Sequence, residues 1–310
     1  MSEPSLEPIV PVPPEVIQAA TRGELIFFVG SGVSQRLNLP SWDQLANKVL
    51  EKLASLEIID YNDVQALKSL DPRKKLSIAQ ILKSDLDYEN YFTSPKDANS
   101  DIYNQLNKIG CTFVTTNYDV NLEPPPTKST SDSTTQRRGT RITSCTRIYP
   151  NVLDDIGNVI HLHGVCDQPS KMVLTMSDYL KLYDNKYVQA LLVHLFKEKT
   201  VVFIGYGLKE SEILEHILRQ GAVREESGQR RLFKLQGFYS SQICLYKYLQ
   251  MYYQKSFGLE LLGFRLDDKS YEVLDRIVEH WANRIDVKSR ALSQDVEAIN
   301  EVLKSDKSLI

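Results

Sequence analysis

Short apolar runs alternate with longer stretches of helical periodicity along this chain. The apolar runs lie at 24–29, 111–115, 158–163 and 200–204, with weaker ones at 171–174, 231–235 and 259–264. Short continuous apolar runs are typical of strands that are buried on both faces of a sheet. Because helical segments separate these runs, the sequence predicts an α/β protein: a Rossmann-like parallel sheet with helices on both faces.

Helical periodicity is clearest after Pro40. Ser41 is a predicted N-cap, and Gln44 completes a capping-box pattern ahead of the apolar positions Leu45 and Val49. The other predicted helices are 15–22, 177–183, 187–198, 213–218, 242–254, 271–283 and 292–303.

The chain is predicted to have three parts: an N-terminal arm over 1–22, a main domain over 23–290 and a C-terminal helix over 291–310. Within the main domain, residues from about 55 to 108 form a predicted helical insertion. Residues 124–147 are rich in Pro, Ser, Thr and Arg and predict a long mobile loop, either a lid or an insert without a role.

Polar or glycine-containing segments follow four of the predicted strands. They are GSGVS at 30–34, TTNYD at 115–119, LHG at 162–164 and GYG at 205–207. In open parallel sheets, ligands bind at the carboxyl ends of the strands. The convergence of these segments at one sheet edge therefore predicts a ligand site.

The two glycine segments allow two interpretations. In the first, Gly30 and Gly32 let backbone N–H groups approach an anion, and Ser31 and Ser34 add hydroxyl groups. In the second, the glycines only turn the chain. Gln35 stands where a dinucleotide fingerprint would place its third glycine. For the turn at 205–207, packing alone is the stronger alternative.

Asn117 and Asp119 follow the strand at 111–115. An Asn side chain can hold a ribose hydroxyl or a water, and an Asp can accept from an amide or hydroxyl. The alternative for both is an Asx-turn cap. His161 and His163 face the same side of their strand; we interpret His161 as a hydrogen-bonded core residue and His163 as a candidate general base. A metal site is not expected, because no third ligand stands nearby.

Charge and cysteine content narrow the function classes. Lys plus Arg is 37 and Asp plus Glu is 40, a net charge of −3, which argues against direct nucleic-acid binding. No apolar run has the length of a membrane span, and the N-terminus lacks a secretory signal. The four cysteines show no C-x-x-C spacing and predict free thiols in the cytoplasm.

Together, the four segments resemble the sirtuin superfamily, and more closely the sirtuin-like NADase domains of bacterial antiphage defence systems. GSGVS matches the family's Gly-Ala-Gly-x-Ser loop, TTNYD its Thr-Gln-Asn-x-Asp segment, His163-Gly164 its His-Gly, and FIGYG its late glycine segment. The resemblance implies NAD as substrate. It implies Asn117 and His163 as catalytic residues. The binding residues it implies are Gly30, Ser31, Gly32, Ser34, Thr116, Asp119, Gly205, Tyr206 and Gly207.

The departures from the family decide between activities. Deacylating sirtuins carry a four-cysteine zinc module, and this chain has no such set. The resemblance therefore implies an NAD glycohydrolase that acts as a defence effector, as a homo-oligomer and with a regulatory partner such as an ATPase or Argonaute-like subunit. Two alternatives stay open: an NAD-dependent protein deacylase, and a non-catalytic subunit that senses NAD or ADP-ribose.

Overall fold

A seven-stranded parallel sheet forms the centre of the molecule. The computed structural model describes residues 6–93, 100–125, 139–143, 148–208, 213–219, 231–267 and 270–287. The strands are β1 (Leu25–Val29), β2 (Thr112–Thr115), β3 (Arg141–Ile142), β4 (Val159–His161), β5 (Thr200–Ile204), β6 (Leu232–Phe238) and β7 (Leu259–Arg265). Their order is β3-β4-β2-β1-β5-β6-β7, and all neighbours are parallel. The predicted α/β architecture is confirmed.

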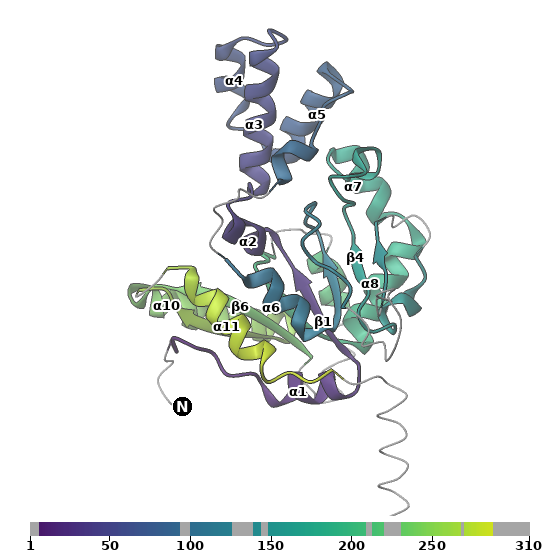
Figure 1. Cartoon of the computed structure of the whole chain (residues 1–310). Coiled ribbons are helices and arrows are strands. Elements are labelled where there is room, and N and C mark those ends of the chain that lie inside the picture. The colour runs from purple at the N-terminus through teal and green to yellow at the C-terminus, as the bar shows by residue number, and fades with distance from the viewer. Residues whose placement is uncertain are drawn as a thin grey trace, which may run out of the picture.

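Helices cover both faces of this sheet (Figure 1). One face packs against α7 (Met176–Tyr183), α8 (Lys186–Glu198), α10 (Ile243–Phe257) and the helical residues 213–219; the other packs against α1 (Pro14–Thr21), α6 (Ile102–Ile109) and α11 (Glu272–Ala282). Alternate residues of β1 divide between the two cores: Phe28 belongs to the first and Phe27 to the second. This division explains why β1 is apolar at every position.

A helical unit over residues 42–92, called the helical insertion below, overlaps the insertion predicted at about 55–108. Its hydrophobic core is shared with Tyr118 and Met172. The insertion contains α3 (Trp42–Ser55), α4 (Tyr61–Leu67), α5 (Pro72–Leu82) and the 3-10 turn η2 (Glu89–Phe92), and its core includes Leu45 and Leu76. The capping box predicted at Ser41 and Gln44 is present at the start of α3. In Figure 1 the insertion projects beyond one end of the sheet, whereas α6 packs beside α11.

Two local predictions are wrong. Residues 171–174 form no strand: a 3-10 turn, η5 (Pro169–Lys171), precedes an extended segment in which Val173 N donates to His163 O at 2.9 Å. Arg141 and Ile142, expected in the mobile loop, form the edge strand β3 beside β4. A two-residue strand is too short to give a periodic signal. Residues 126–138, 144–147 and the predicted helix at 292–303 lie outside the described residues.

The order in which strands are added to the sheet reverses at β1. After β1 the sheet grows through β2 and β4 on one side, and later through β5, β6 and β7 on the other. The short helix α2 (Ser31–Ser34) and the 3-10 turns η1 (Gln35–Leu37), η4 (Pro150–Leu153) and η6 (Ser240–Gln242) complete the elements. Open α/β sheets bind ligands outside the strand ends at such a reversal. That position lies at the end of the sheet that carries α2 and the insertion (Figure 1).

Within the described part of the chain, no helix combines the length and the apolar character needed to cross a bilayer.

Candidate functional site

The turns after β1 and β5 touch through their backbones at the reversal point. Gly30 N donates to Ile204 O at 2.9 Å, and Gly32 N donates to Gly205 O at 2.8 Å. A Cβ atom on Gly30 would lie 2.6 Å from Gly205 O, and one on Gly205 would lie 2.5 Å from Val33 N. Gly205 also has a positive φ of 60°. Both positions therefore require glycine, for the close approach and for the backbone angle.

This contact changes the roles expected of the glycine turn. The N–H groups of Gly30 and Gly32 were expected to face an anion, but both donate to backbone carbonyls of the neighbouring turn. Ser31 is half-buried and Gly207 is exposed, so these residues form the more open part of the two turns. Ser34 is buried and points into a polar network instead.

Asn117, Ser34 and Asp119 form the centre of that network. Asn117 Nδ2 donates to Gly30 O at 3.0 Å and to Ser34 Oγ at 2.9 Å. Ser34 Oγ in turn donates to Asp119 Oδ2 at 2.7 Å. Asn117 is 7% exposed and Asp119 is 2% exposed. Both hydrogens of the Asn117 amide are thus used within the protein, and Oδ1 is the acceptor atom of this side chain.

Asp119 is held by donors from three residues. Besides Ser34, Tyr103 OH donates to Oδ2 at 3.0 Å, and Asn121 donates to Oδ1 from its backbone N at 3.2 Å and its Nδ2 at 2.9 Å. Burial and the Asp119 charge raise the pKa of Tyr103 well above its usual range, so this phenol stays a donor. The Asp119 carboxylate therefore fixes the positions of Ser34, Tyr103 and Asn121.

The remaining binding candidates lie around these turns. Thr116 is half-buried between β2 and Asn117. The ring of Tyr206 packs in the sheet core, 4.7 Å from the ring centroid of Phe28 and 5.8 Å from that of Phe203. Tyr206 therefore anchors the turn at 205–207 to the hydrophobic core.

His161 lies in the core and fixes the backbone of Asn117. It is fully buried, and its Nδ1 lies 3.1 Å from Asn117 O. A carbonyl only accepts, so Nδ1 carries the proton. Burial lowers the pKa of His161 to about 4, although the hydrogen bond to Asn117 O acts in the opposite direction. The prediction of a hydrogen-bonded core histidine is confirmed.

His163 lies in an aromatic cluster rather than in the polar network. Its Nε2 is 3.1 Å from Tyr183 OH and its Nδ1 is 3.4 Å from Tyr179 OH. The side chain is 1% exposed. Burial, with the charge of Arg73 as a second cause, lowers the pKa of His163 to about 3. The imidazole is therefore neutral near pH 7, as a general base must be.

Tyr118 connects the two groups. Its hydroxyl donates to Val173 O at 2.6 Å, and its ring stacks on Trp42 at a centroid distance of 5.5 Å. The ring centroid of Tyr118 lies 6.4 Å from that of His163. The residue between Asn117 and Asp119 thus joins β2 to the helical insertion and to the histidine cluster.

Comparison with known proteins finds two similarities. Residues 111–241 match the family model described as SIR2-like domain. This stretch of the chain is therefore similar to SIR2-like domains. The chain is also 28% identical over 215 residues to Defense-associated sirtuin 2 of Bacillus subtilis; the match covers 64% of this chain and 19% of that protein. The chain therefore spans about a fifth of the length of this relative.

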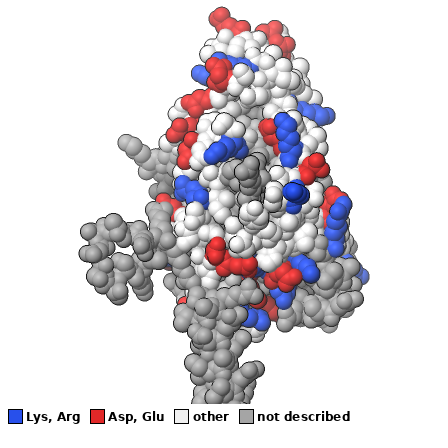
Figure 2. Space-filling model, turned by 90° about the vertical axis from the view of Figure 1, so that its right-hand side faces the viewer, with Lys and Arg blue, Asp and Glu red and all other residues white. Residues whose placement is uncertain are grey.

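Among the described residues, no group of three or more His, Cys, Asp and Glu side chains is placed to hold a metal ion. Lys and Arg are interspersed with Asp and Glu on the face shown in Figure 2.

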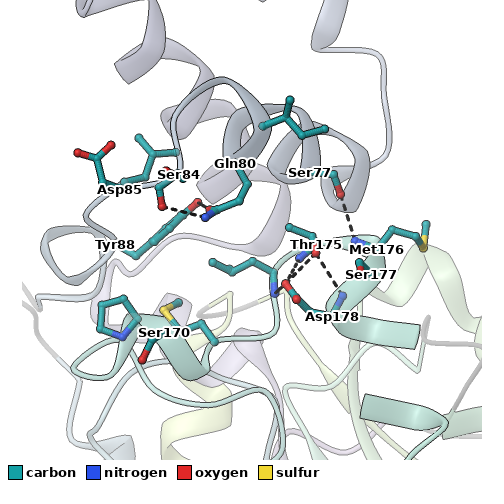
Figure 3. Close-up of a pocket in the computed structure, with 15 residues that line it drawn as sticks. Ser77, Gln80, Ser84, Asp85, Tyr88, Ser170, Thr175, Met176, Ser177 and Asp178 are labelled. Carbon is teal, nitrogen blue, oxygen red and sulfur yellow. Dashed lines mark hydrogen bonds between the residues drawn. The ribbon is translucent and has the colours of Figure 1, made fainter. Parts of the chain in front are cut away.

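A pocket of about 830 Å³ lies apart from the polar network. Figure 3 shows Ser77 and Gln80 of α5 on one side of it and Thr175 and Asp178 on the other. None of the described residues predicted for the nucleotide site lines this pocket. Asp178 accepts from Thr175 N at 2.9 Å and so caps α7, while Ser77 Oγ accepts from Met176 N at 3.1 Å. The pocket therefore lies between α5 and α7, and the hydrogen bond from Met176 N to Ser77 Oγ joins the two helices at its edge.

Several residues around the candidate site were not predicted from the sequence. Tyr103 reaches Asp119 from α6, and Arg73 and Trp42 reach the histidine cluster from the insertion. No motif marks these three residues. Tyr179 and Tyr183 did carry a signal, since a spacing of four places both on one face of a helix that follows His163.

Proposed function

We propose that the protein is an NAD glycohydrolase, which cleaves NAD to nicotinamide and ADP-ribose. The observation that carries this proposal is the hydrogen-bonded chain from Gly30 through Asn117 and Ser34 to Asp119. It stands at the strand reversal, where open α/β sheets bind nucleotides. It also combines residues of the glycine turn and of the TTNYD segment, which lie far apart in the sequence.

The ligand is proposed to lie across the two glycine turns. Ser31 and Gly207 are the accessible parts of these turns, and Thr116 lies at the end of the adjacent strand β2. Ser31 would contact the pyrophosphate, and the turn at 205–207 would contact the adenosine half. The backbone hydrogen bond between Gly32 and Gly205 fixes the distance between the two turns, so this part of the proposed site is organised before the ligand binds.

Hydrolysis requires few side chains. The bond between nicotinamide and the ribose breaks with its electron pair on the nicotinamide nitrogen, and a water oxygen then bonds to the ribose carbon and loses a proton. Asn117 Oδ1 can accept a hydrogen bond from this water, because the amide nitrogen is already engaged. His163, neutral near pH 7, would take a proton from a ribose hydroxyl or from the water.

The biological setting is also a proposal. The relative is described as a defence-associated sirtuin, and this chain matches only 19% of it. We place the activity in the bacterial cytoplasm, as an antiphage effector that depletes NAD. An unrestrained NADase would kill its own cell, so the proposal includes restraint by a homo-oligomer or by a regulatory partner, for example an ATPase or Argonaute-like subunit.

The test is an assay of NAD loss by chromatography with three proteins: wild type, Asn117→Ala and the control Asn104→Ala. Asn104 is exposed on α6, and its side chain donates to Asp101, which is not part of the network. Each protein is assayed alone, with an acyl-lysine peptide, and with the products of neighbouring genes. NAD loss without peptide that Asn117→Ala abolishes supports hydrolysis. Strict dependence on the peptide would show a deacylase, and NAD binding without turnover in every condition would show a sensing subunit.

A further inference from the structure

Two tyrosines of α7 hold the imidazole of His163 from both sides. Tyr183 OH lies 3.1 Å from Nε2, and Tyr179 OH lies 3.4 Å from Nδ1. The ring centroids of His163 and Tyr179 are 4.9 Å apart, with the planes at 63°. With the side chain only 1% exposed, no ribose hydroxyl can reach either nitrogen in this arrangement.

The two contacts are unequal. The contact at Nε2 has an ordinary hydrogen-bond length, whereas the one at Nδ1 is near the upper limit of such a bond. A neutral imidazole has one N–H donor and one acceptor nitrogen. If Nε2 carries the proton and donates to Tyr183, Nδ1 is left as the acceptor, and Tyr179 OH is its donor. The nitrogen with the longer contact is then the one able to accept a proton.

Tyr179 is tied to the helical insertion. The guanidinium carbon of Arg73, on α5, lies 4.9 Å from the centroid of the Tyr179 ring, and Trp42, on α3, lies 6.3 Å from it. Close by, Ser77 Oγ accepts from Met176 N at the start of α7. A shift of α5 relative to α7 would therefore move Tyr179, whereas Tyr183 lies one turn further along the helix, towards α8.

We propose that Tyr183 is a positioning residue that holds His163 through Nε2–H, and that Tyr179 covers Nδ1 until it moves with the helical insertion. This inference rests on the proposed function. In the open state a ribose hydroxyl reaches Nδ1: its O–H bond breaks, a new N–H bond forms, and the electron pair stays on the ribose oxygen. The imidazolium that results donates from Nε2 to the oxygen of Tyr183.

The surroundings of His163 agree with an inactive closed state. The pKa of about 3 means that this imidazole cannot hold a proton at pH 7. Burial is the main cause, and the charge of Arg73 is the second. Arg73 lies on the insertion, and Tyr179 is one of the rings that bury His163, so the movement that uncovers Nδ1 would weaken both causes of the low pKa. One motion would then provide both access and basicity.

Two matched variants, Tyr183→Phe and Tyr179→Phe, separate the roles. Each keeps its ring and loses one hydroxyl. The first measurement is ¹⁵N–¹H NMR of protein labelled on its histidine rings; the chain has 5 histidines, and His163→Gln assigns the signal. We expect the Nε2–H tautomer in the wild type and in Tyr179→Phe, and a mixed population in Tyr183→Phe. An Nδ1–H tautomer in the wild type would overturn the proposal.

The second measurement is the rate of His163 modification by diethyl pyrocarbonate, followed by peptide mass spectrometry. Tyr179→Phe should raise this rate at least about fivefold and keep or raise NAD hydrolysis, whereas Tyr183→Phe should lower hydrolysis about tenfold or more. Equal effects of the two substitutions on both readouts would overturn the proposal while leaving the hydrolase function intact. If no protein hydrolyses NAD, the proposed function fails, and the tautomer and the modification rate still decide the positioning roles.

Discussion

Ser34 is the residue through which the polar network is continuous. Its hydroxyl accepts from Asn117 and donates to Asp119, and its Oγ also lies 3.0 Å from Tyr103 OH. A glycine-rich turn usually attracts attention for its backbone. Here the last residue of the turn matters for its side chain, because it orients the amide that we propose to hold the water.

Replacing Ser34 with Ala should destabilise the protein. The change leaves one Asn117 hydrogen without its acceptor and removes one donor from the buried Asp119. Each unsatisfied buried group costs about 1–3 kcal/mol. We expect Ser34→Ala to lower the free energy of unfolding, measured with urea, by about 1–3 kcal/mol. The control Ser31→Ala, at a half-buried position, should change it by no more than about 0.5 kcal/mol. Equal effects of the two substitutions would contradict the network.

His163 should make stability depend on pH in acid. Its folded-state pKa of about 3 is below its ordinary value, so between pH 6.5 and 3 the unfolded chain binds the proton more tightly. The stabilisation is therefore complete above pH 6.5 and is lost as the pH falls towards 3. In this window the difference in unfolding free energy between wild type and His163→Gln should shrink by about 1.4 kcal/mol per pH unit.

The control for this measurement is His280→Gln, at the end of α11. If the curve for His163→Gln departs from that of the wild type by no more than the curve for His280→Gln does, the imidazole of His163 is not buried in its neutral form. His161, whose pKa is lowered to about 4, contributes in the same direction and is common to all three proteins.

Among the elements, the contact between the turns after β1 and β5 is the tightest feature of the site. Gly30→Ala would place a methyl group 2.6 Å from Gly205 O and from the Cα of Tyr206, both backbone atoms. Such overpacking costs about 1–3 kcal/mol or more, and it would also separate the two turns. We expect a lower thermal midpoint and weaker NAD binding by calorimetry.

Gly207→Ala is the matched control, since Gly207 is exposed and outside the left-handed region. It should leave the thermal midpoint within about 2 °C of the wild type. A Gly30→Ala protein as stable as this control would show that the close approach of the turns is not required.

Strand β6 carries a buried lysine that contacts α10. Lys234, on β6, is 4% exposed, and burial lowers its pKa to about 8. Its Nζ donates to Gln236 Oε1 at 2.7 Å and to Tyr253 OH at 3.2 Å. Because the charged form is disfavoured by burial, Lys234→Met should raise the free energy of unfolding at pH 7 by about 1–3 kcal/mol.

The pH dependence gives this prediction its control. The folded-state pKa of Lys234 is lowered, so wild-type stability rises with pH between about 8 and 10.5. The advantage of Lys234→Met should therefore shrink across that range in urea titrations. An advantage that does not change with pH would assign the effect to packing and not to the charge.

The sequence predicted most elements, and the reasons for its failures are physical. Apolar runs such as 200–204 and the capping box at Ser41 carry local signals, and both predictions are confirmed. The edge strand Arg141–Ile142 depends on pairing with β4, and the extended segment at 172–174 depends on the hydrogen bond from Val173 N to His163 O. Such tertiary contacts leave no periodic pattern in the sequence.

The candidate site was predicted in part for the same reason. Its motif residues stand at strand ends, where the order of the elements alone brings them together. The partners of these residues could not be predicted: Tyr103, Arg73 and Trp42 come from α6, α5 and α3. The engagement of Gly30 and Gly32 with the β5 turn also depends on which strand lies next to β1, and the sequence does not state that order.

At the scale of the molecule, the family match and the site do not have the same extent. The SIR2-like match begins at residue 111, yet the glycine turn and the helical insertion lie before it. The insertion contributes Arg73 and Trp42 to the histidine cluster, so it is part of the proposed site. A partner that acts on the insertion would therefore act on the site.

The most direct test of the account is the release of nicotinamide from NAD by the wild type, Asn117→Ala and Asn104→Ala, each at equal concentration and with folding verified by circular dichroism. The account predicts equimolar nicotinamide and ADP-ribose from the wild type and from Asn104→Ala. It predicts at least about a hundredfold less from Asn117→Ala. Wild-type turnover that Asn117→Ala leaves unchanged would contradict the account.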